Sequence, residues 1–317
     1  MRYFDVFNGD ADGICALHQL RLADPVDSTL FTGLKRDIEL LKEVPAGAGD
    51  VVTVLDISLD RNRTALLELL ERGATVRYFD HHFAGDIPSH EGLEVAIDAS
   101  GMLCTSALID RHLRGRFRIW AVVGAFGDNL EDRAAELARP LQLDADRLEA
   151  LRELGNVLNY NAYGESEADV MVPPAELYRI VSHYADPFEL LRLEPVIARL
   201  VDERREDLQR ALEAHPARVL PTASAWVLPD APWSRRVIGT FANRLALAEP
   251  HRAHAVLTPA HGAFVVSVRS PRGKSPTAVE FCRRFPTGGG RALAAGIDRL
   301  QPDGLDRFLQ DFAATFQ

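Results

Sequence analysis

The first third of the chain alternates short apolar runs with amphipathic stretches, and this order constrains the fold more than any other feature. Apolar runs at residues 2–7, 51–56 and 75–79 are typical of buried strands. Helical patterns lie between them, at residues 13–22 and 63–72. Parallel strands need a crossover connection of roughly a dozen residues or more, usually a helix. The order therefore predicts an α/β fold with a doubly wound parallel sheet.

The remainder of the chain predicts a helical region, a connecting helix and a second, smaller α/β domain. Residues 103–191 have amphipathic helical spacing, and residues 194–215 form a long pattern rich in Glu, Asp and Arg that is typical of a solvated helix. We therefore expect a catalytic domain over residues 1–192, a connecting helix over 193–215 and a substrate-binding domain over 216–317. The elements expected in the last domain are strands at 224–228, 253–258 and 263–269 and helices at 236–248 and 275–285.

Composition restricts the class of protein. A net charge of −10 argues against a protein that coats long nucleic acid, which requires a basic face, but it allows a short anionic substrate. No apolar run reaches the roughly 18 residues of a membrane helix, and the start of the chain lacks the pattern of a signal peptide. The three cysteines form neither a disulfide framework nor a zinc pattern. We therefore expect a cytoplasmic protein with no membrane partner and no long duplex partner.

Acidic residues and histidines stand at the ends of the predicted apolar elements. They are Asp10 and Asp12, Asp56, the triplet Asp80, His81 and His82, and Asp128. Each alone is commonly a turn or a helix cap. The carboxyl ends of parallel strands lie along one edge of a sheet, so these groups can converge there. Crowded carboxylates repel one another unless cations offset them, and oxygen and imidazole donors suit Mn²⁺ or Mg²⁺. The pattern predicts two such ions acting on a phosphorus centre.

These motifs together resemble the DHH phosphoesterases, a family named for the Asp-His-His triplet found here at 80–82. The resemblance implies a ligand set of Asp10, Asp12, Asp56, His81 and Asp128. Within it, Asp56 would bridge the two ions, Asp12, His81 and Asp128 would hold one, and Asp10 would help to hold the other. His82 would contact the scissile phosphate, and Asp80 would orient the two histidines.

The second domain resembles the DHH-associated substrate domain. Its marker is the triplet Gly288, Gly289 and Gly290, followed by Arg291 and a short Ala-rich segment. We expect a glycine-rich turn that leads into a helix start, which would favour an anion. Arg291 would offer a guanidinium fork to a phosphate or a base edge. Arg269 and Ser270 match a further element of that domain and are expected to contact substrate.

Two positions depart from the family pattern. Many members have a histidine four residues before the first aspartate, where this chain has Val6. The second metal site would then be weaker, or would use Asn8 or water. The glycine triplet is usually followed by histidine, where this chain has Arg291. The second departure bears on the identity of the substrate rather than on the chemistry.

The family resemblance implies a hydrolase similar to the nanoRNases, which degrade very short oligoribonucleotides, and to exonucleases of the RecJ type. We therefore expect a short oligonucleotide or dinucleotide as substrate, held between the two domains and cleaved to mononucleotides. An alternative is a cyclic dinucleotide, another small phosphoester or pyrophosphate. An alternative from a different class is an inactive nucleotide-binding regulator. The sequence does not determine whether the substrate is RNA or DNA, which oligonucleotide length is preferred, or whether the chain forms a homodimer.

Overall fold

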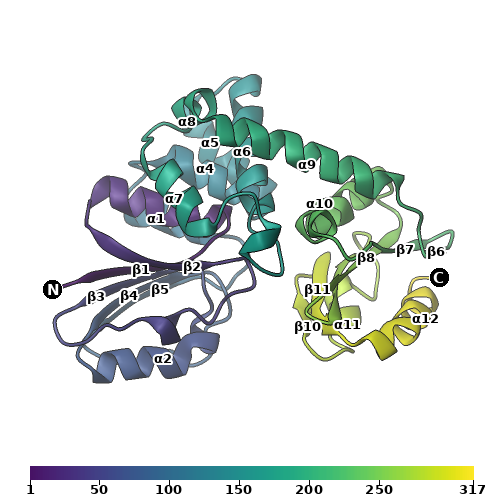
Figure 1. Ribbon diagram of the computed structural model, residues 1–317, viewed down its shortest axis with the longest axis horizontal. Helices are drawn as coiled ribbons and strands as arrows, with labels where there is room; N and C mark the ends of the chain where they lie inside the picture. The colour runs from purple at the N-terminus through teal and green to yellow at the C-terminus, as the bar shows by residue number, and fades with distance from the viewer. The chain divides into compact units, whose positions relative to one another are not determined.

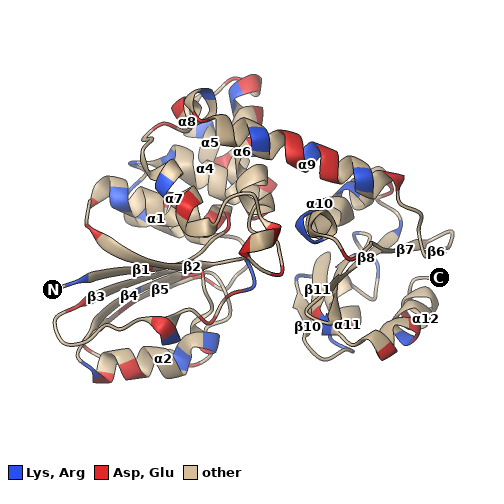
Figure 2. Cartoon of the chain, viewed as in Figure 1, with Lys and Arg blue, Asp and Glu red and all other residues tan.

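The computed structural model describes residues 1–317, which divide into two compact units, Met1–Val201 and Asp202–Gln317. The division falls inside helix α9 (Pro195–Glu213), which occupies most of the segment expected as a connecting helix. Acidic and basic residues alternate along α9 (Figure 2), as its sequence pattern predicted. None of the helices combines the length and the apolar composition that a bilayer-spanning segment requires.

The first unit contains a five-stranded parallel sheet, so the predicted fold class is confirmed (Figure 1). Its strand order is β2-β1-β3-β4-β5, and every neighbouring pair is parallel. The strands are β1 (Tyr3–Asn8), β2 (Ser28–Gly33), β3 (Val51–Leu55), β4 (Thr75–Asp80) and β5 (Leu93–Ile97). The sequence predicted β1, β3 and β4. It did not predict β2 and β5, which are only partly buried strands at the two edges of the sheet.

Helices cover both faces of this sheet. Helix α1 (Ala11–Ala23) and helix α2 (Leu59–Glu71) lie on opposite sides of it in Figure 1. The leucines of α2 pack with strand residues that include Val6, Val54 and Val76 to form one hydrophobic core. The predicted run of helices is present and comprises α3 (Thr105–His112), α4 (Arg118–Gly127), α5 (Glu131–Ala138), α6 (Ala145–Tyr160), α7 (Pro174–Ser182) and α8 (Pro187–Leu193). Helix α1 is buried over residues 11–20, because it packs against this helical layer as well as the sheet.

The strand order places a topological switch point between β1 and β3. The chain leaves β1 for its neighbour β2 on one side and returns to β3 on the other side. Connections that diverge in this way open a crevice at the carboxyl ends of the two strands, where α/β proteins bind ligands. The motif residues Asp10 and Asp56 directly follow these two strands.

The second unit contains a six-stranded mixed sheet of order β10-β11-β9-β8-β7-β6. Its strands are β6 (Arg218–Val219), β7 (Ala223–Val227), β8 (Ala253–Ala260), β9 (Ala263–Arg269), β10 (Gly288–Gly290) and β11 (Ala294–Leu300). Its helices are α10 (Pro232–Ala248), α11 (Ala278–Cys282) and α12 (Leu305–Thr315). The predicted β7, β8, β9 and α10 are present, whereas the helix expected over residues 275–285 is only the five residues of α11. A phenylalanine cluster of Phe281, Phe308, Phe312 and Phe316 fills the core between α11, α12 and the sheet.

The glycine triplet corrects one prediction. It is a strand, β10, that pairs antiparallel with β11, with Gly289 opposite Gly296. The segment that follows Arg291 forms strand β11 rather than a helix, so the expected helix-terminus anion site is absent there. Small residues fit a helix start by propensity, but β11 lies between two strands and has close backbone neighbours. A Cβ atom on Gly296 would lie 2.7 Å from the carbonyl oxygen of Val266 on β9, so tertiary pairing outweighs local propensity there.

Candidate metal centre

Four adjacent strands of the first unit each present a polar residue at the same edge of the sheet. In sheet order they are Lys35 after β2, Asp10 after β1, Asp56 after β3 and His81 after β4. Asp12 joins them from the first turn of α1, directly behind β1. Asp10, Asp12, Asp56 and His81 are all buried. The structure therefore brings together groups that are up to 71 residues apart along the chain.

Asp10 is held rigidly because it caps helix α1. Its Oδ1 accepts hydrogen bonds from the backbone amides of Asp12 at 2.9 Å and Gly13 at 3.1 Å. Its own amide donates to the side-chain oxygen of Asn8 at 3.1 Å. The turn requires glycine at position 13, because a Cβ atom there would lie 2.1 Å from the carbonyl oxygen of Asn8. The segment Asn-Gly-Asp-Ala-Asp-Gly thus caps helix α1 and, through the same hydrogen bonds, fixes the orientation of the Asp10 carboxylate.

Asp12 is anchored by the N-terminus of helix α3. Its Oδ2 accepts from the amide of Thr105 at 2.7 Å and its Oδ1 from the amide of Ser106 at 2.8 Å. Amides at a helix N-terminus stabilise a carboxylate through both hydrogen bonds and the helix dipole. The Thr105 hydroxyl also donates to Oδ1 of Asp56 at 3.0 Å. One residue of α3 therefore positions both carboxylates.

Asp56 has a strained backbone at the end of β3. Its φ of 60° lies in the left-handed region, which costs roughly 1–3 kcal/mol for a residue other than glycine. Its amide donates to the carbonyl of Phe79 in the neighbouring strand at 3.0 Å, which helps to hold this conformation. Residues in such strained conformations cluster at ligand and catalytic sites.

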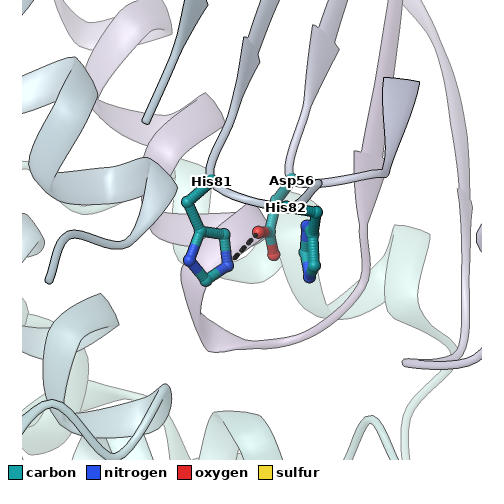
Figure 3. A group of neighbouring side chains, drawn as sticks. All are labelled: Asp56, His81 and His82. Atoms are coloured by element: carbon teal, nitrogen blue, oxygen red, sulfur yellow. Dashed lines mark ion pairs between the residues drawn. The ribbon is translucent and has the colours of Figure 1, made fainter. Parts of the chain in front are cut away.

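The hydrogen bond of His81 determines which ring nitrogen faces the carboxylates. Its Nδ1 lies 3.0 Å from the carbonyl oxygen of Leu103, which can only accept, so Nδ1 carries a proton. Its Nε2 lies 3.3 Å from Oδ1 of Asp56 and 3.9 Å from Oδ2 of Asp12 (Figure 3). In the neutral ring, Nε2 is therefore the nitrogen with a free lone pair, as a metal ligand requires.

His82 is oriented differently and is the more exposed of the two histidines. Its Nδ1 lies 2.7 Å from Oδ1 of the fully buried Asp80, and 44% of its side chain is exposed. Figure 3 shows Asp56 between the two rings, and donor atoms of Asp56, His81 and His82 all lie within 4.8 Å of one another. The resemblance implied that Asp80 would orient both histidines. Asp80 forms its hydrogen bond with His82, whereas the ring of His81 is oriented by its hydrogen bond to the carbonyl of Leu103.

The electrostatics of the cluster fit a bound cation. Burial and the negative charges of Asp12 and Asp10 raise the pKa of Asp56 well above its usual value. Burial lowers the pKa of His81, but the adjacent Asp56 outweighs it and raises this pKa to about 10. In both cases the negative charge of neighbouring carboxylates raises the pKa, in the same direction as burial for Asp56 and against burial for His81. A divalent cation with oxygen and imidazole ligands offsets this negative charge, so this donor set fits Mn²⁺ or Mg²⁺.

Asp128 belongs to the same electrostatic environment. It is the C-cap residue of helix α4, followed by Asn129 with a φ of 58°. Its negative charge is among the causes that raise the pKa values of His81 and Lys35. The structure thus places all five residues of the expected ligand set in one unit and in one electrostatic cluster.

Three residues at this edge were not predicted from the sequence. Lys35 lies beside Asp10, with Asn159 as a second partner, and Thr105 contacts Asp56. The segment Thr-Leu-Phe-Thr-Gly at residues 29–33 has the β-branched residues and terminal glycine of a strand. Recognising it would have placed Lys35 at the same edge as the other groups. Thr105 had no comparable signal, because its role depends on how α3 packs against α1.

The expected substrate residues of the second unit are engaged in local contacts. Arg269 donates to the side-chain oxygens of Asn243 at 2.7 Å and Ser267 at 2.9 Å. The hydroxyl of Ser270 donates to the carbonyl of Ala292 and accepts from the amide of Ala278. Gly288, Gly289 and Gly290 pair within the sheet as β10. Arg291 is exposed at the end of β10.

Comparison with solved structures identifies the fold. No family model matches the chain, and no curated protein sequence matches it. A RecJ exonuclease bound to manganese aligns over 99% of this chain and 89% of its own, with a TM-score of 0.63 and 19% identity. The pGpG-specific phosphodiesterase PggH from Vibrio cholerae aligns over 99% of both chains, with a TM-score of 0.53 and 15% identity. An exopolyphosphatase-related protein from Bacteroides fragilis aligns over 99% and 92%, with a TM-score of 0.52 and 15% identity.

At 15–19% identity this likeness shows the fold. The chain shares the α/β fold of these structures, which confirms the predicted fold class.

Proposed function

We propose that this chain is a divalent-metal-dependent phosphodiesterase that hydrolyses very short oligoribonucleotides, including dinucleotides, to mononucleotides. One observation carries the proposal. Asp10, Asp12 and Asp56 converge with Nε2 of His81 at the carboxyl edge of the sheet, where the fold places its switch point. Such a buried acidic cluster has no evident structural use, and its fold is shared with a manganese-bound exonuclease.

The side chains divide into those that would hold the cation and those that would act on substrate. Asp12, Asp56, His81 and Asp128 would hold it. Thr105 keeps Asp12 and Asp56 in position, and the carbonyl of Leu103 does so for His81. When bound, a divalent cation lowers the pKa of a ligated water and stabilises charge on phosphate oxygens. His82 has its Nδ1 directed to Asp80, so Nε2 is the ring nitrogen that would face substrate, and it would donate a hydrogen bond to a phosphate oxygen when the ring is in its imidazolium form.

The expected substrate length rests on charge and on one neighbour. The net charge of −10 argues against binding of long nucleic acid, which requires a basic face. The neighbour that aligns over nearly its full length is described as specific for pGpG, a linear dinucleotide. Arg269 and Arg291 of the second unit are the candidates for binding the substrate phosphates or base edges. We therefore propose a short single-stranded oligonucleotide as the substrate and the cytoplasm as the location of the protein.

Product analysis tests the proposal. The purified chain is stripped of metal with a chelator, returned to Mn²⁺ or Mg²⁺, and incubated with RNAs and DNAs of two to ten nucleotides. Cyclic dinucleotides and pyrophosphate are included in parallel. We expect mononucleotides from the shortest RNAs only when metal is present.

The other outcomes separate the alternatives. Release of phosphate from pyrophosphate alone, or opening of cyclic dinucleotides alone, would replace the proposed substrate. Retention of a nucleotide without any product would indicate a binding protein. Full activity with metal content confirmed as nil would remove the metal-dependent mechanism altogether.

A further inference from the structure

Lys35 occupies a position at the metal centre that is fixed by its backbone as well as its side chain. Its amide donates to the carbonyl of Ala162 at 2.9 Å, and its carbonyl accepts from the side-chain amide of Asn8 at 3.1 Å. Its ammonium donates to Oδ2 of Asp10 and, at 3.1 Å, to Oδ1 of Asn159. It also lies 5.7 Å from the ring centre of Tyr163, within the range of a cation–π interaction. The ammonium is therefore held against Asp10 from several sides.

Both carboxylate oxygens of Asp10 accept hydrogen bonds from protein groups. Oδ1 accepts the two amides of the α1 cap, and Oδ2 accepts the ammonium of Lys35. A divalent cation on Oδ2 would be next to the ammonium, and the two positive charges would repel each other strongly in this buried position.

Val6 and Asn8, the two positions from which the sequence raised a ligand for a second cation, do not supply one. Val6 stands where a histidine would be expected, and its side chain is buried in the hydrophobic core against α2. The sequence suggested Asn8 as a substitute ligand. Its Oδ1 accepts the amide of Asp10 and its Nδ2 donates to the carbonyl of Lys35, so its side chain is committed to the turn.

We propose that the ammonium of Lys35 takes the place of one of the two divalent cations expected from the sequence. The centre would bind one divalent ion, through Asp12, Asp56, His81 and Asp128. Lys35 would neutralise Asp10 and provide the second positive charge beside the phosphate. This inference deepens the proposed function, since it concerns the same site, but its main test needs no substrate.

The test counts metal ions. Full-length protein is titrated with Mn²⁺ by calorimetry, the bound metal is measured by elemental analysis, and the Mn²⁺ is examined by electron paramagnetic resonance. We expect one ion per chain and a signal from isolated Mn²⁺, without the signature of a magnetically coupled pair.

Two variants separate the charge of Lys35 from its packing. Lys35→Ala removes the ammonium and opens space at Asp10, so we expect a second, weaker Mn²⁺ to bind. Lys35→Arg keeps the positive charge, so this variant should still bind one Mn²⁺ ion per chain. Lys42→Met is the matched control, because Lys42 is an exposed lysine of the same loop region, paired only with Glu39. At about 0.1 mM Mn²⁺, turnover of Lys35→Ala should fall by about 100-fold, the scale of losing one fixed charge-stabilising group. Millimolar Mn²⁺ should restore part of it.

Two results would overturn the inference. One is two Mn²⁺ ions per wild-type chain with a coupled-pair signal. The other is an unchanged count of one in Lys35→Ala, since Lys35 would then not be what excludes the second ion. Neither result depends on turnover. If wild-type protein bound one ion as expected but hydrolysed no phosphodiester, the proposed function would be wrong and the inference about Lys35 would still hold.

Discussion

The backbone amide of Thr105 donates a 2.7 Å hydrogen bond to Oδ2 of Asp12, a residue 93 positions earlier in the chain. The same threonine donates its hydroxyl to Asp56 at 3.0 Å. Helix α3 thereby sets the distance between two carboxylates that come from different βα junctions. The geometry of the centre thus depends on a residue that is not itself a metal ligand.

The first prediction concerns this threonine. Thr105→Val keeps the volume and the backbone amide but removes the hydrogen bond to Asp56. Loss of such an outer contact typically weakens metal binding by about 10- to 100-fold. We expect a decrease of this size in Mn²⁺ affinity, measured by competition with a chelating dye, and little change in the melting temperature. Thr105→Ser retains the hydroxyl and should behave like wild type. Equal affinities in all three proteins would show that the hydroxyl does not position Asp56.

The second prediction concerns Asp56 and Asp128, each replaced by asparagine. Asparagine tolerates the left-handed backbone of Asp56 but carries no charge. Turnover should fall by several orders of magnitude, because a ligand for the cation is lost. Burial and the neighbouring carboxylates raise the pKa of Asp56, so its charged form opposes folding at neutral pH. Metal-free Asp56→Asn should therefore melt at or above the wild-type temperature. Near wild-type turnover in the purified Asp56→Asn variant would contradict the site assignment.

The third prediction concerns Arg291, where the chain departs from the family pattern. An arginine is always charged and presents a planar fork suited to a terminal phosphate or to guanine. We expect a preference for very short 5′-phosphorylated substrates with a purine bias. Arg291→Ala should reduce kcat/KM on the preferred dinucleotide by roughly 5- to 150-fold, corresponding to about 1–3 kcal/mol for a bidentate contact.

Two comparisons control this experiment. Hydrolysis of bis-p-nitrophenyl phosphate should change much less in Arg291→Ala, because the metal centre is intact. Arg283→Ala, at another exposed arginine of the second unit, should leave both activities unchanged. Equal losses on both substrates would indicate a folding defect, and no loss on either would show that Arg291 does not contact substrate.

The fourth prediction concerns pH and the buried His18. Burial lowers its pKa from 6.5 to about 4, although its Nε2 donates to the carbonyl of Tyr184 at 2.8 Å. Between these two values the unfolded chain binds more protons than the folded chain, so the free energy of unfolding falls as the pH is lowered through this range. The contribution of His18 alone amounts to roughly 3 kcal/mol at most.

Urea unfolding at pH 7 and pH 4.5 measures this effect. His18→Gln does not titrate and can still donate a hydrogen bond, so it should lose less stability than wild type between the two pH values. His215→Gln, which replaces an exposed histidine, should show the wild-type difference. If His18→Gln also showed the full wild-type difference, other groups would be responsible for the acid sensitivity.

Much of the fold could be predicted because the signals are local. The apolar runs of β1, β3 and β4 and the helical spacing that follows them depend only on neighbouring residues, and they define a parallel α/β unit. The edge strand β2 was missed because it is only partly buried and so lacks the continuous apolar run of the central strands. The glycine triplet was misread because glycine and alanine carry no side-chain pattern that separates a turn or helix start from a strand. The pairing of β10 with β11, and of β11 with β9, decided the outcome.

The same division applies to the metal centre. The sequence alone determined which residue types stand at the βα junctions, and their carboxylate and imidazole chemistry indicates a divalent cation. Only the tertiary structure decided that β2 places Lys35 against Asp10, that Leu103 directs Nε2 of His81 toward Asp56, and that Thr105 links Asp12 to Asp56. The physical reason is that each of these contacts joins residues 22 or more positions apart. Such contacts arise from the packing of strands and helices and leave no local pattern along the chain.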